Sequence, residues 1–369
     1  MKTTEPITAQ NSWLWRRKTA LLIVGLVVGA IGLGLSAALI PPWYDDACHW
    51  LVARTLAHTG ETAFPLVTNM TQTDPDSRFI TVGPAVNYPV AAWMKVVGDG
   101  FWSARILMSL FGFGVLLALF AIAKSLIHSA KAVWSVILLA GSVPFMTFGS
   151  QLLGEGPLLL YLLLGFWALL TKDTLSWRNA LLAALAFNLA ILSKEYIALP
   201  LGLTVLVGFI NTKVKHEDAW LKWLTIGVLL PVGVGLWYVS RFDSLDALQV
   251  YWAQKSTYSS EFLALTFSQS LRFLLFKPVI LLGTLALVFR VIFSKEKQDV
   301  ILLVFQLQLM FWFLLSAGYD RFGFLLMPIA CIYLGEWVYA VLLRMDTSLL
   351  KTRRVQQAGF LLVVLLICW

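Results

Sequence analysis

Two adjacent carboxylates, Asp45 and Asp46, are the residues of this chain whose types and spacing most directly suggest chemistry. Two like charges this close bind a proton more readily than one alone, which suits a general base that deprotonates a hydroxyl group. The same pair could instead cap a helix, because a carboxylate at a helix start accepts bonds from free amide groups. We favour the catalytic interpretation, since the pair directly follows a hydrophobic run and unpaired carboxylates at a membrane surface are costly.

A further carboxylate, Glu155, stands between Gly154 and Gly156 at the start of another apolar run. It could complement the positive end of a helix. It could also face Asp45 across a cavity and bind sugar hydroxyl groups or a metal ion, and the flanking glycines would let a ligand approach closely. The sequence leaves both open. No motif requires a cofactor, and the one candidate is a divalent cation, Mg²⁺ or Mn²⁺, held by Asp45 and Glu155.

Lys194 and Arg321 are the basic residues of two short turns that we expect on the same side as Asp45. An anionic lipid phosphate needs cations at this depth. As an alternative, the two residues anchor the chain at the interface and pair with Glu195 and Asp320. The sequence favours the anchor interpretation for Lys194. For Arg321 it leaves the anchor and the phosphate-binding interpretations equally open.

Three aromatic residues near the acidic pair complete the candidate site. His49 follows Asp45 by four residues, which places both on one helix face and could make a metal site, although isolated His–Asp pairs are usually structural. We expect His49 to face water. Tyr44 and Tyr88 could stack on a sugar, but aromatic residues here more often belong to an interfacial belt.

Composition identifies the elements that must position these residues. Of 369 residues 59% are hydrophobic and 13% are charged, whereas a soluble protein has about 25% charged residues. The chain is therefore a membrane protein. If its N-terminus is cytoplasmic, 18 of the 28 Lys and Arg residues fall on the cytoplasmic side, so the net charge of +8 reflects topology and not nucleic-acid binding.

We expect an all-α bundle of about eleven spans, treated as one membrane domain over residues 1–369. The first span covers 19–40, a large outward loop covers 41–100, and the other spans lie in 101–369. The later runs are 101–123, 132–149, 154–170, 179–193, 196–211, 221–240, 271–293, 299–317, 322–343 and 357–369. The run at 357–369 is short for a full span. The boundary at Lys194-Glu195 could be a turn or a break.

Two interfacial helices are predicted in the loop. The first runs from Ala47 to His58 and ends at Gly60. The second runs from Tyr88 to Val97, with Pro89 in its first turn. An Asn69-Met70-Thr71 sequon lies between them.

Several enzyme classes lack their signatures here. The sequence has no nucleotide-binding glycine motif, no His-Glu-x-x-His and no Gly-x-Ser-x-Gly. A lipid or sugar transporter or flippase is one alternative, for which Glu336 would be the main mid-span charge. A non-catalytic membrane assembly subunit is another.

Short motifs along most of the chain resemble the GT-C integral-membrane glycosyltransferases, within them the protein O-mannosyltransferase and aminoarabinose transferase group (families 39 and 83). The matching residues are Tyr44-Asp45-Asp46, Ala53, Gly60, Gly83-Pro84, Tyr88-Pro89, Ala104-Arg105, Gly154-Glu155-Gly156-Pro157, Ser193-Lys194-Glu195, Tyr319-Asp320-Arg321 and Pro328. Asp46 stands where the family commonly has Glu. Members of the family usually have more spans or a C-terminal extension.

The resemblance implies an inverting transfer from a polyprenyl-phosphate sugar to an acceptor hydroxyl of a lipid, glycan or protein, with Asp45 as the catalytic base. We expect Lys194 and Arg321 to bind the donor phosphate and Glu155 to orient the acceptor. The reaction would take place on the outer face of a multi-pass protein in the bacterial inner membrane.

Overall fold

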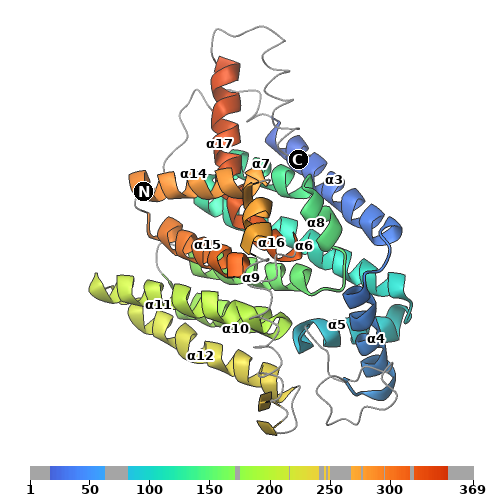
Figure 1. The fold of residues 1–369 in the computed structure, drawn as a ribbon. Helices are drawn as coiled ribbons and strands as arrows, with labels where there is room; N and C mark the ends of the chain where they lie inside the picture. Colours follow the sequence, from blue (N-terminus) through green and yellow to red (C-terminus); the bar gives the residue numbers. More distant parts are fainter. Residues whose placement is uncertain are drawn as a thin grey trace.

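The computed structural model describes residues 17–62, 82–170, 175–215, 217–240, 245–246, 248–249, 267–275, 277–294, 296–315 and 320–347. All regular structure in these ranges is helical, which confirms the predicted all-α class (Figure 1). The predicted run 357–369, the Asn69 sequon and Tyr319 lie outside the described residues.

The helices follow the apolar runs, because in lipid only a helix satisfies its own backbone groups. They are α3 (Lys18–Leu39), α4 (Tyr44–Thr59), α5 (Pro84–Val97), α6 (Phe101–Ile127), α7 (Ser129–Ala140), α8 (Val143–Phe148), α9 (Glu155–Leu170), α10 (Trp177–Ser193), η2 (Glu195–Ile197), α11 (Ala198–Val214), α12 (Trp220–Val239), α14 (Pro278–Ser294), α15 (Lys297–Leu315), α16 (Asp320–Phe324) and α17 (Met327–Thr347).

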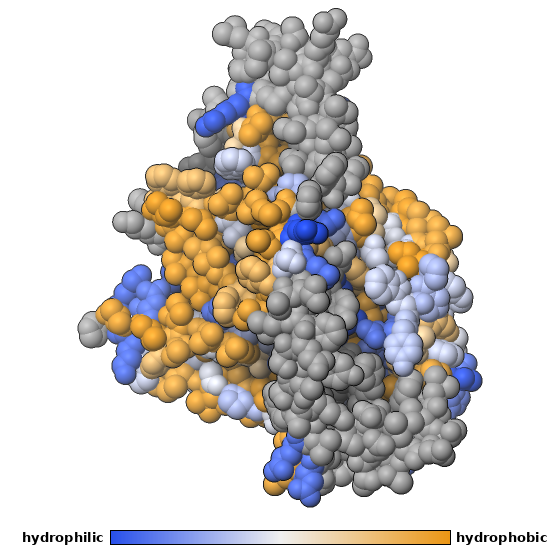
Figure 2. Space-filling view, viewed as in Figure 1, coloured by the Kyte–Doolittle hydropathy of each residue, from blue (hydrophilic) through white to orange (hydrophobic). Residues whose placement is uncertain are grey.

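Six of the described helices are long and apolar enough to cross a membrane: α3, α6, η2 with α11, α12, α15 and α17. A bent pair, residues 267–275 followed by α14, would make a seventh. Large apolar side chains such as Leu199, Val228 and Phe311 point outward, as lipid contact requires. Figure 2 shows hydrophobic side chains over α11, α12 and α15 and hydrophilic groups at the left edge of the view. The protein is a multi-pass membrane protein.

The predicted span 132–149 is not one helix. It divides into α7 and α8 at Gly141-Ser142, where the Ser142 hydroxyl accepts a bond from the Phe145 amide, 3.4 Å away, and caps α8. Pro144 fits this first turn because it lacks the amide that would be free there. The boundary at Lys194 is a break between α10 and η2, with Lys194 in extended backbone.

Helices α4 and α5 pack on each other and on the start of α6, at what we call the α4 end of the bundle (Figure 1, lower right). Helix α4 ends at Gly60, whose φ of 82° places it in the left-handed region, as predicted. It begins at Tyr44 and not at Ala47. Helix α5 begins at Pro84, so the prediction that Pro89 occupies the first turn is wrong.

Helix α4 is a packed helix and does not simply lie on the membrane surface. Ala53 is buried against Val86 and Val90 of α5 and Met108 of α6. His49, predicted to face water, is buried. Periodicity within α4 could not reveal this, because the covering residues come from α5 and α6.

Asp99 fastens α4 to the turn before α6. Its Oδ2 accepts a bond from Arg54 Nε at 2.8 Å and lies 3.0 Å from His58 Nε2, and its carbonyl accepts a bond from Trp50 Nε1 at 3.0 Å. The bonds from His58 and Arg54 lower the pKa of Asp99. These bonds join the middle and the end of α4 to the turn before α6.

Candidate functional site

The two neighbouring aspartates face different surroundings in the first turn of α4, since successive side chains on a helix point about 100° apart. Asp46 is 0% exposed and accepts two bonds from Arg105, through Nε and Nη2, on its Oδ2. Its Oδ1 accepts a bond from the Leu152 amide at 2.7 Å. Burial raises the pKa of Asp46, and the bond and charge of Arg105 oppose that rise.

Arg105 also donates to backbone carbonyls at the end of α3, those of Ala37 at 3.2 Å and Ile40 at 2.5 Å. The Arg105–Asp46 pair thus joins α3, α4, α6 and the turn before α9. This placement favours a structural part for Asp46 over direct catalysis. Sequence reasoning noticed Arg105 only as the start of a span.

Asp45 points elsewhere and remains partly open. Its Oδ2 accepts a bond from Arg321 Nη1 at 2.5 Å, and the two side chains are 27% and 14% exposed. Arg321 comes from α16, which Phe324 fixes against Phe145 and Phe148 of α8 at ring distances of 6.1 and 6.4 Å. The contact joins residues 276 positions apart in the chain. Only folding brings the predicted base and the predicted phosphate ligand together.

Glu155 and Lys194 form a second charged pair, with Lys194 Nζ 3.4 Å from Glu155 Oε1. Both side chains are buried. Gly154 makes the approach possible: its φ is 88°, and a Cβ there would lie 3.1 Å from Lys194 Cε. Burial lowers the pKa of Lys194, and Glu155 opposes it.

The two pairs belong to one electrostatic unit, which we call the α4-end cluster: Asp45, Glu155, Lys194 and Arg321. Burial alone would lower the pKa of Arg321, but the carboxylates of Glu155 and Asp45 outweigh burial and raise it. Arg321 and Lys194 also influence each other. Four segments far apart in sequence therefore supply two carboxylates and two cations to one place.

Three further predicted site residues, Tyr44, Tyr88 and His49, are not members of this cluster. Tyr44 and Tyr88 are exposed. His49 is buried on α4. The predicted sugar stacking of the two tyrosines and the predicted substrate or metal binding by His49 stay predictions.

The metal prediction finds no support in the geometry. Asp45 pairs with Arg321 and Glu155 with Lys194, so each predicted ligand already faces a cation. Across the described ranges, no group of three His, Cys, Asp or Glu side chains is placed to hold a metal ion. A divalent cation at Asp45 and Glu155 stays a prediction.

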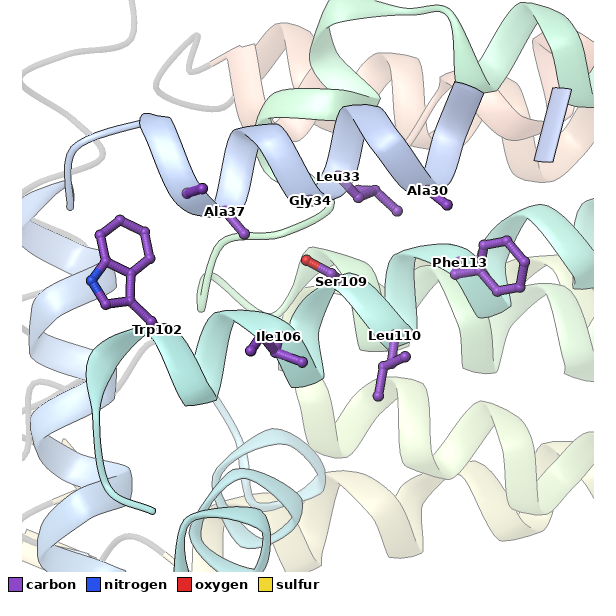
Figure 3. A pocket seen from close by; sticks show the side chains of 10 residues that line it. Ala30, Leu33, Gly34, Ala37, Trp102, Ile106, Ser109, Leu110 and Phe113 are labelled. Carbon is purple, nitrogen blue, oxygen red and sulfur yellow. The ribbon is translucent and has the colours of Figure 1, made fainter. Parts of the chain in front are cut away.

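An apolar groove of about 570 Å³ runs between α3 and α6 (Figure 3). Gly34 and Ala37 line one wall, and Trp102, Ile106 and Leu110 line the other. One end of the groove reaches Ala37, whose carbonyl accepts a bond from Arg105. The groove therefore ends beside the last turn of α3, to which Arg105 is bonded.

Sequence reasoning missed Gln151, in the turn between α8 and α9. Its side chain is buried, and neither its Nε2 nor its Oε1 has a hydrogen-bond partner in the described protein. A polar residue four positions before Glu155 was the one available signal.

Comparisons with known proteins agree with this fold. Residues 81–237 match the family model described as dolichyl-phosphate-mannose-protein mannosyltransferase. No curated protein sequence matches the chain.

Among solved structures, the chain is similar to ArnT from Cupriavidus metallidurans bound to undecaprenyl phosphate, with 16% identity and a TM-score of 0.58. It is also similar to the Archaeoglobus fulgidus oligosaccharyltransferase in the apo form, with 12% identity and a TM-score of 0.61, and to the same enzyme tethered with an acceptor peptide, with 12% and 0.56.

These likenesses cover 94%, 96% and 95% of this chain but 63%, 56% and 54% of those chains. The chain thus spans less than two thirds of their length. At these identities the likeness is one of fold, and it confirms the architecture that the sequence resemblance predicted.

Proposed function

We propose that this chain, which has the fold of the GT-C membrane glycosyltransferases, transfers a sugar from a polyprenyl-phosphate donor to an acceptor hydroxyl with inversion at the anomeric carbon. The observation that carries the proposal is the meeting of Asp45 with Arg321, beside Glu155 and Lys194. A base next to a cation that could hold a leaving phosphate is what such a transfer needs.

In the proposed reaction Asp45 takes the proton of the acceptor hydroxyl, whose oxygen attacks the anomeric carbon. The bond from that carbon to the phosphate oxygen breaks, and the polyprenyl phosphate leaves with the electron pair. Arg321 and Lys194 stabilise the phosphate charge. Arg321 bonds to Asp45 in this structure, so an arriving phosphate would draw Arg321 away and free the carboxylate to act as a base.

The hydrocarbon chain of the donor would lie in the groove between α3 and α6, which is lined mostly by apolar side chains, together with Ser109. The acceptor would be a lipid, a glycan or a protein. We further propose that the α4 end faces the periplasm of a bacterial inner membrane, because most basic residues of the sequence fall on the other side. A polyprenyl-phosphate sugar, which is carried in the membrane, can be delivered to the periplasmic side.

The central test is Asp45→Asn, assayed in purified, reconstituted protein with a panel of labelled polyprenyl-phosphate sugars and acceptors. Transfer should fall at least about 10³-fold, because the amide cannot take the proton, while the amount of folded protein is unchanged. Asp99→Asn is the matched control, since Asp99 is also a carboxylate of this end that bonds to basic side chains, and it should keep transfer. Full activity in Asp45→Asn would refute the mechanism.

A further inference from the structure

Two buried polar side chains, Gln151 in the turn between α8 and α9 and Glu155 directly after that turn, make no side-chain hydrogen bond to the described protein, although Glu155 is ion-paired with Lys194. Gln151 is 1% exposed and Glu155 is 0% exposed. Both terminal atoms of Gln151 and both carboxylate oxygens of Glu155 have no hydrogen-bond partner in the described protein. Buried polar groups in proteins nearly always have partners, and each one left without costs about 1–3 kcal/mol. The turn is therefore incomplete as it stands.

The position of the turn places these groups at the α4-end cluster. The amide of Leu152, next to Gln151, donates to Asp46, the neighbour of the proposed base. Gly154, next to Glu155, packs against Lys194 Cε. The turn thus runs from the acidic pair to the proposed phosphate ligand.

The turn is also rigid, so its polar groups are held in place. Asp46 fixes Leu152, whose side chain is buried among Ala53, Val86 and Met108. A Cβ on Gly112 would lie 2.8 Å from the Gly149 carbonyl, so α6 packs directly on the start of the turn. The two side chains cannot easily turn away to find water.

The chemistry of the two groups selects a kind of ligand. A carboxylate only accepts hydrogen bonds, and an amide donates and accepts. Hydroxyl groups match both, because each donates one bond and accepts others. A phosphate does not match Glu155, and Lys194 and Arg321 are already suited to it.

We propose that Gln151 and Glu155 form a sugar subsite that binds hydroxyl groups of the transferred sugar and restricts the donor to uncharged, hydroxyl-bearing sugars. The inference rests on the proposed function, since it places the sugar of the donor beside Glu155 in the α4-end cluster. A uronic acid would bring a second carboxylate towards Glu155 and would be disfavoured. Gln151 is a positioning residue in this scheme and takes no part in bond making.

The test replaces Gln151 by Met, which keeps the volume and removes the amide. Binding is measured with purified protein and three probes: polyprenyl phosphate, polyprenyl-phosphate mannose, and polyprenyl-phosphate glucuronic acid. Wild type should bind the mannose lipid more tightly than the glucuronic acid lipid. Gln151→Met should weaken mannose-lipid binding about five- to tenfold and leave bare polyprenyl phosphate unchanged, because one or two neutral hydrogen bonds are lost.

Deoxy analogues of the mannose lipid identify the partner. One analogue should bind wild type and Gln151→Met equally well, because the hydroxyl that the amide contacts is already missing. If Gln151→Met weakens every probe alike, or none, the subsite is refuted while the proposed function stands. If polyprenyl phosphate and both sugar lipids fail to bind the wild type, the proposed function fails and the subsite with it.

Thermal unfolding separates this role from a structural one. Removing an unpaired buried amide should leave the melting temperature of the ligand-free protein unchanged or raise it. Gln306→Met is the matched control. Gln306 is equally buried and its Oε1 also has no partner, but its Nε2 donates to Thr284 Oγ1 and the Leu326 carbonyl, both at 3.1 Å, so its loss should lower the melting temperature. A melting temperature of Gln151→Met that falls as far as the control would overturn the inference.

Discussion

Charged side chains gather near both ends of α6, and the two groups differ in how fully the protein satisfies them. At the start of α6, Arg105 holds Asp46 beside the α4-end cluster. At its far end the Leu126 carbonyl accepts a bond from Arg290, at 3.3 Å, in a group that we call the far-end cluster: Lys131, Arg290, Asp299 and Glu336. At 1.5 Å per residue, Arg105 and Leu126 lie about 32 Å apart along the helix, close to the thickness of a bilayer core.

Every carboxylate oxygen of the far-end cluster has a donor. Glu336 accepts from Lys131 at 2.7 Å and from Arg290 at 2.5 Å, one on each oxygen. Asp299 accepts from the Tyr333 hydroxyl at 2.7 Å on one oxygen and from Arg290 and Ser294 on the other. This cluster joins α7, α14, α15 and α17 and leaves little for a ligand to bind.

The α4 end of the bundle contains both kinds of carboxylate. Asp46 is satisfied like Asp299, whereas Glu155 has an ion pair but no hydrogen bond, and Asp45 is partly exposed. The comparison teaches that a buried charged group whose hydrogen bonds are all made by the protein indicates a structural role. A buried charged group that lacks hydrogen bonds indicates a ligand-binding role. The comparison also argues against a transporter, because the predicted mid-span charge, Glu336, belongs to the satisfied group.

The largest effect should come from breaking the Arg105–Asp46 pair. Arg105→Met leaves Asp46 buried without its cation, and such a loss costs about 3–5 kcal/mol. We expect little folded protein in membranes, measured by fluorescence-detected size-exclusion chromatography. Arg321→Met removes the cation that pairs with Asp45, and this pair is more exposed than the Arg105–Asp46 pair. The Arg321→Met protein should accumulate normally but lose transfer activity. Equal accumulation of both variants would erase the distinction between the two aspartates.

A smaller effect should follow from the far-end cluster. Glu336→Gln keeps the shape of the side chain and weakens two ion pairs that are partly exposed, so we expect a loss of about 1–3 kcal/mol in unfolding free energy. Binding of polyprenyl phosphate should be unchanged, because the cluster lies at the other end of α6. Thermal unfolding and polyprenyl-phosphate binding, measured on one preparation of Glu336→Gln, test the two expectations. A loss of lipid binding without a loss of stability would mean that the two ends of α6 are coupled.

Sequence patterns predicted the helices better than their contacts, for a physical reason. Apolar runs specify spans because lipid allows little else, and Gly60 specifies a helix end through its left-handed backbone. The break at Gly141-Ser142 was missed, because hydropathy is the same on both sides of it. Asp45 and Arg321 were predicted separately as base and phosphate ligand, but their contact depends on tertiary packing. The burial of Gln151 and His49 also depends on tertiary packing, so the residues next to them in the sequence do not reveal it.

The smallest effect concerns the groove between α3 and α6, the one feature that connects the α4-end cluster to lipid in the proposed function. A Cβ on Gly34 would meet no atom within 4 Å, so a side chain can start there without a clash, and Gly34→Leu is expected to fill part of the groove. We expect the KM for a long-chain polyprenyl donor to rise a few-fold, about 1 kcal/mol, with kcat and the melting temperature unchanged. A donor with a short prenyl chain should be unaffected, because it does not reach the filled part. Gly202→Leu is the matched control, since Gly202 lines an apolar groove between α11 and α12 and is equally open. If Gly202→Leu raises the KM and Gly34→Leu does not, the donor chain lies along α11 and α12, and the connection between the α3–α6 groove and the cluster is refuted.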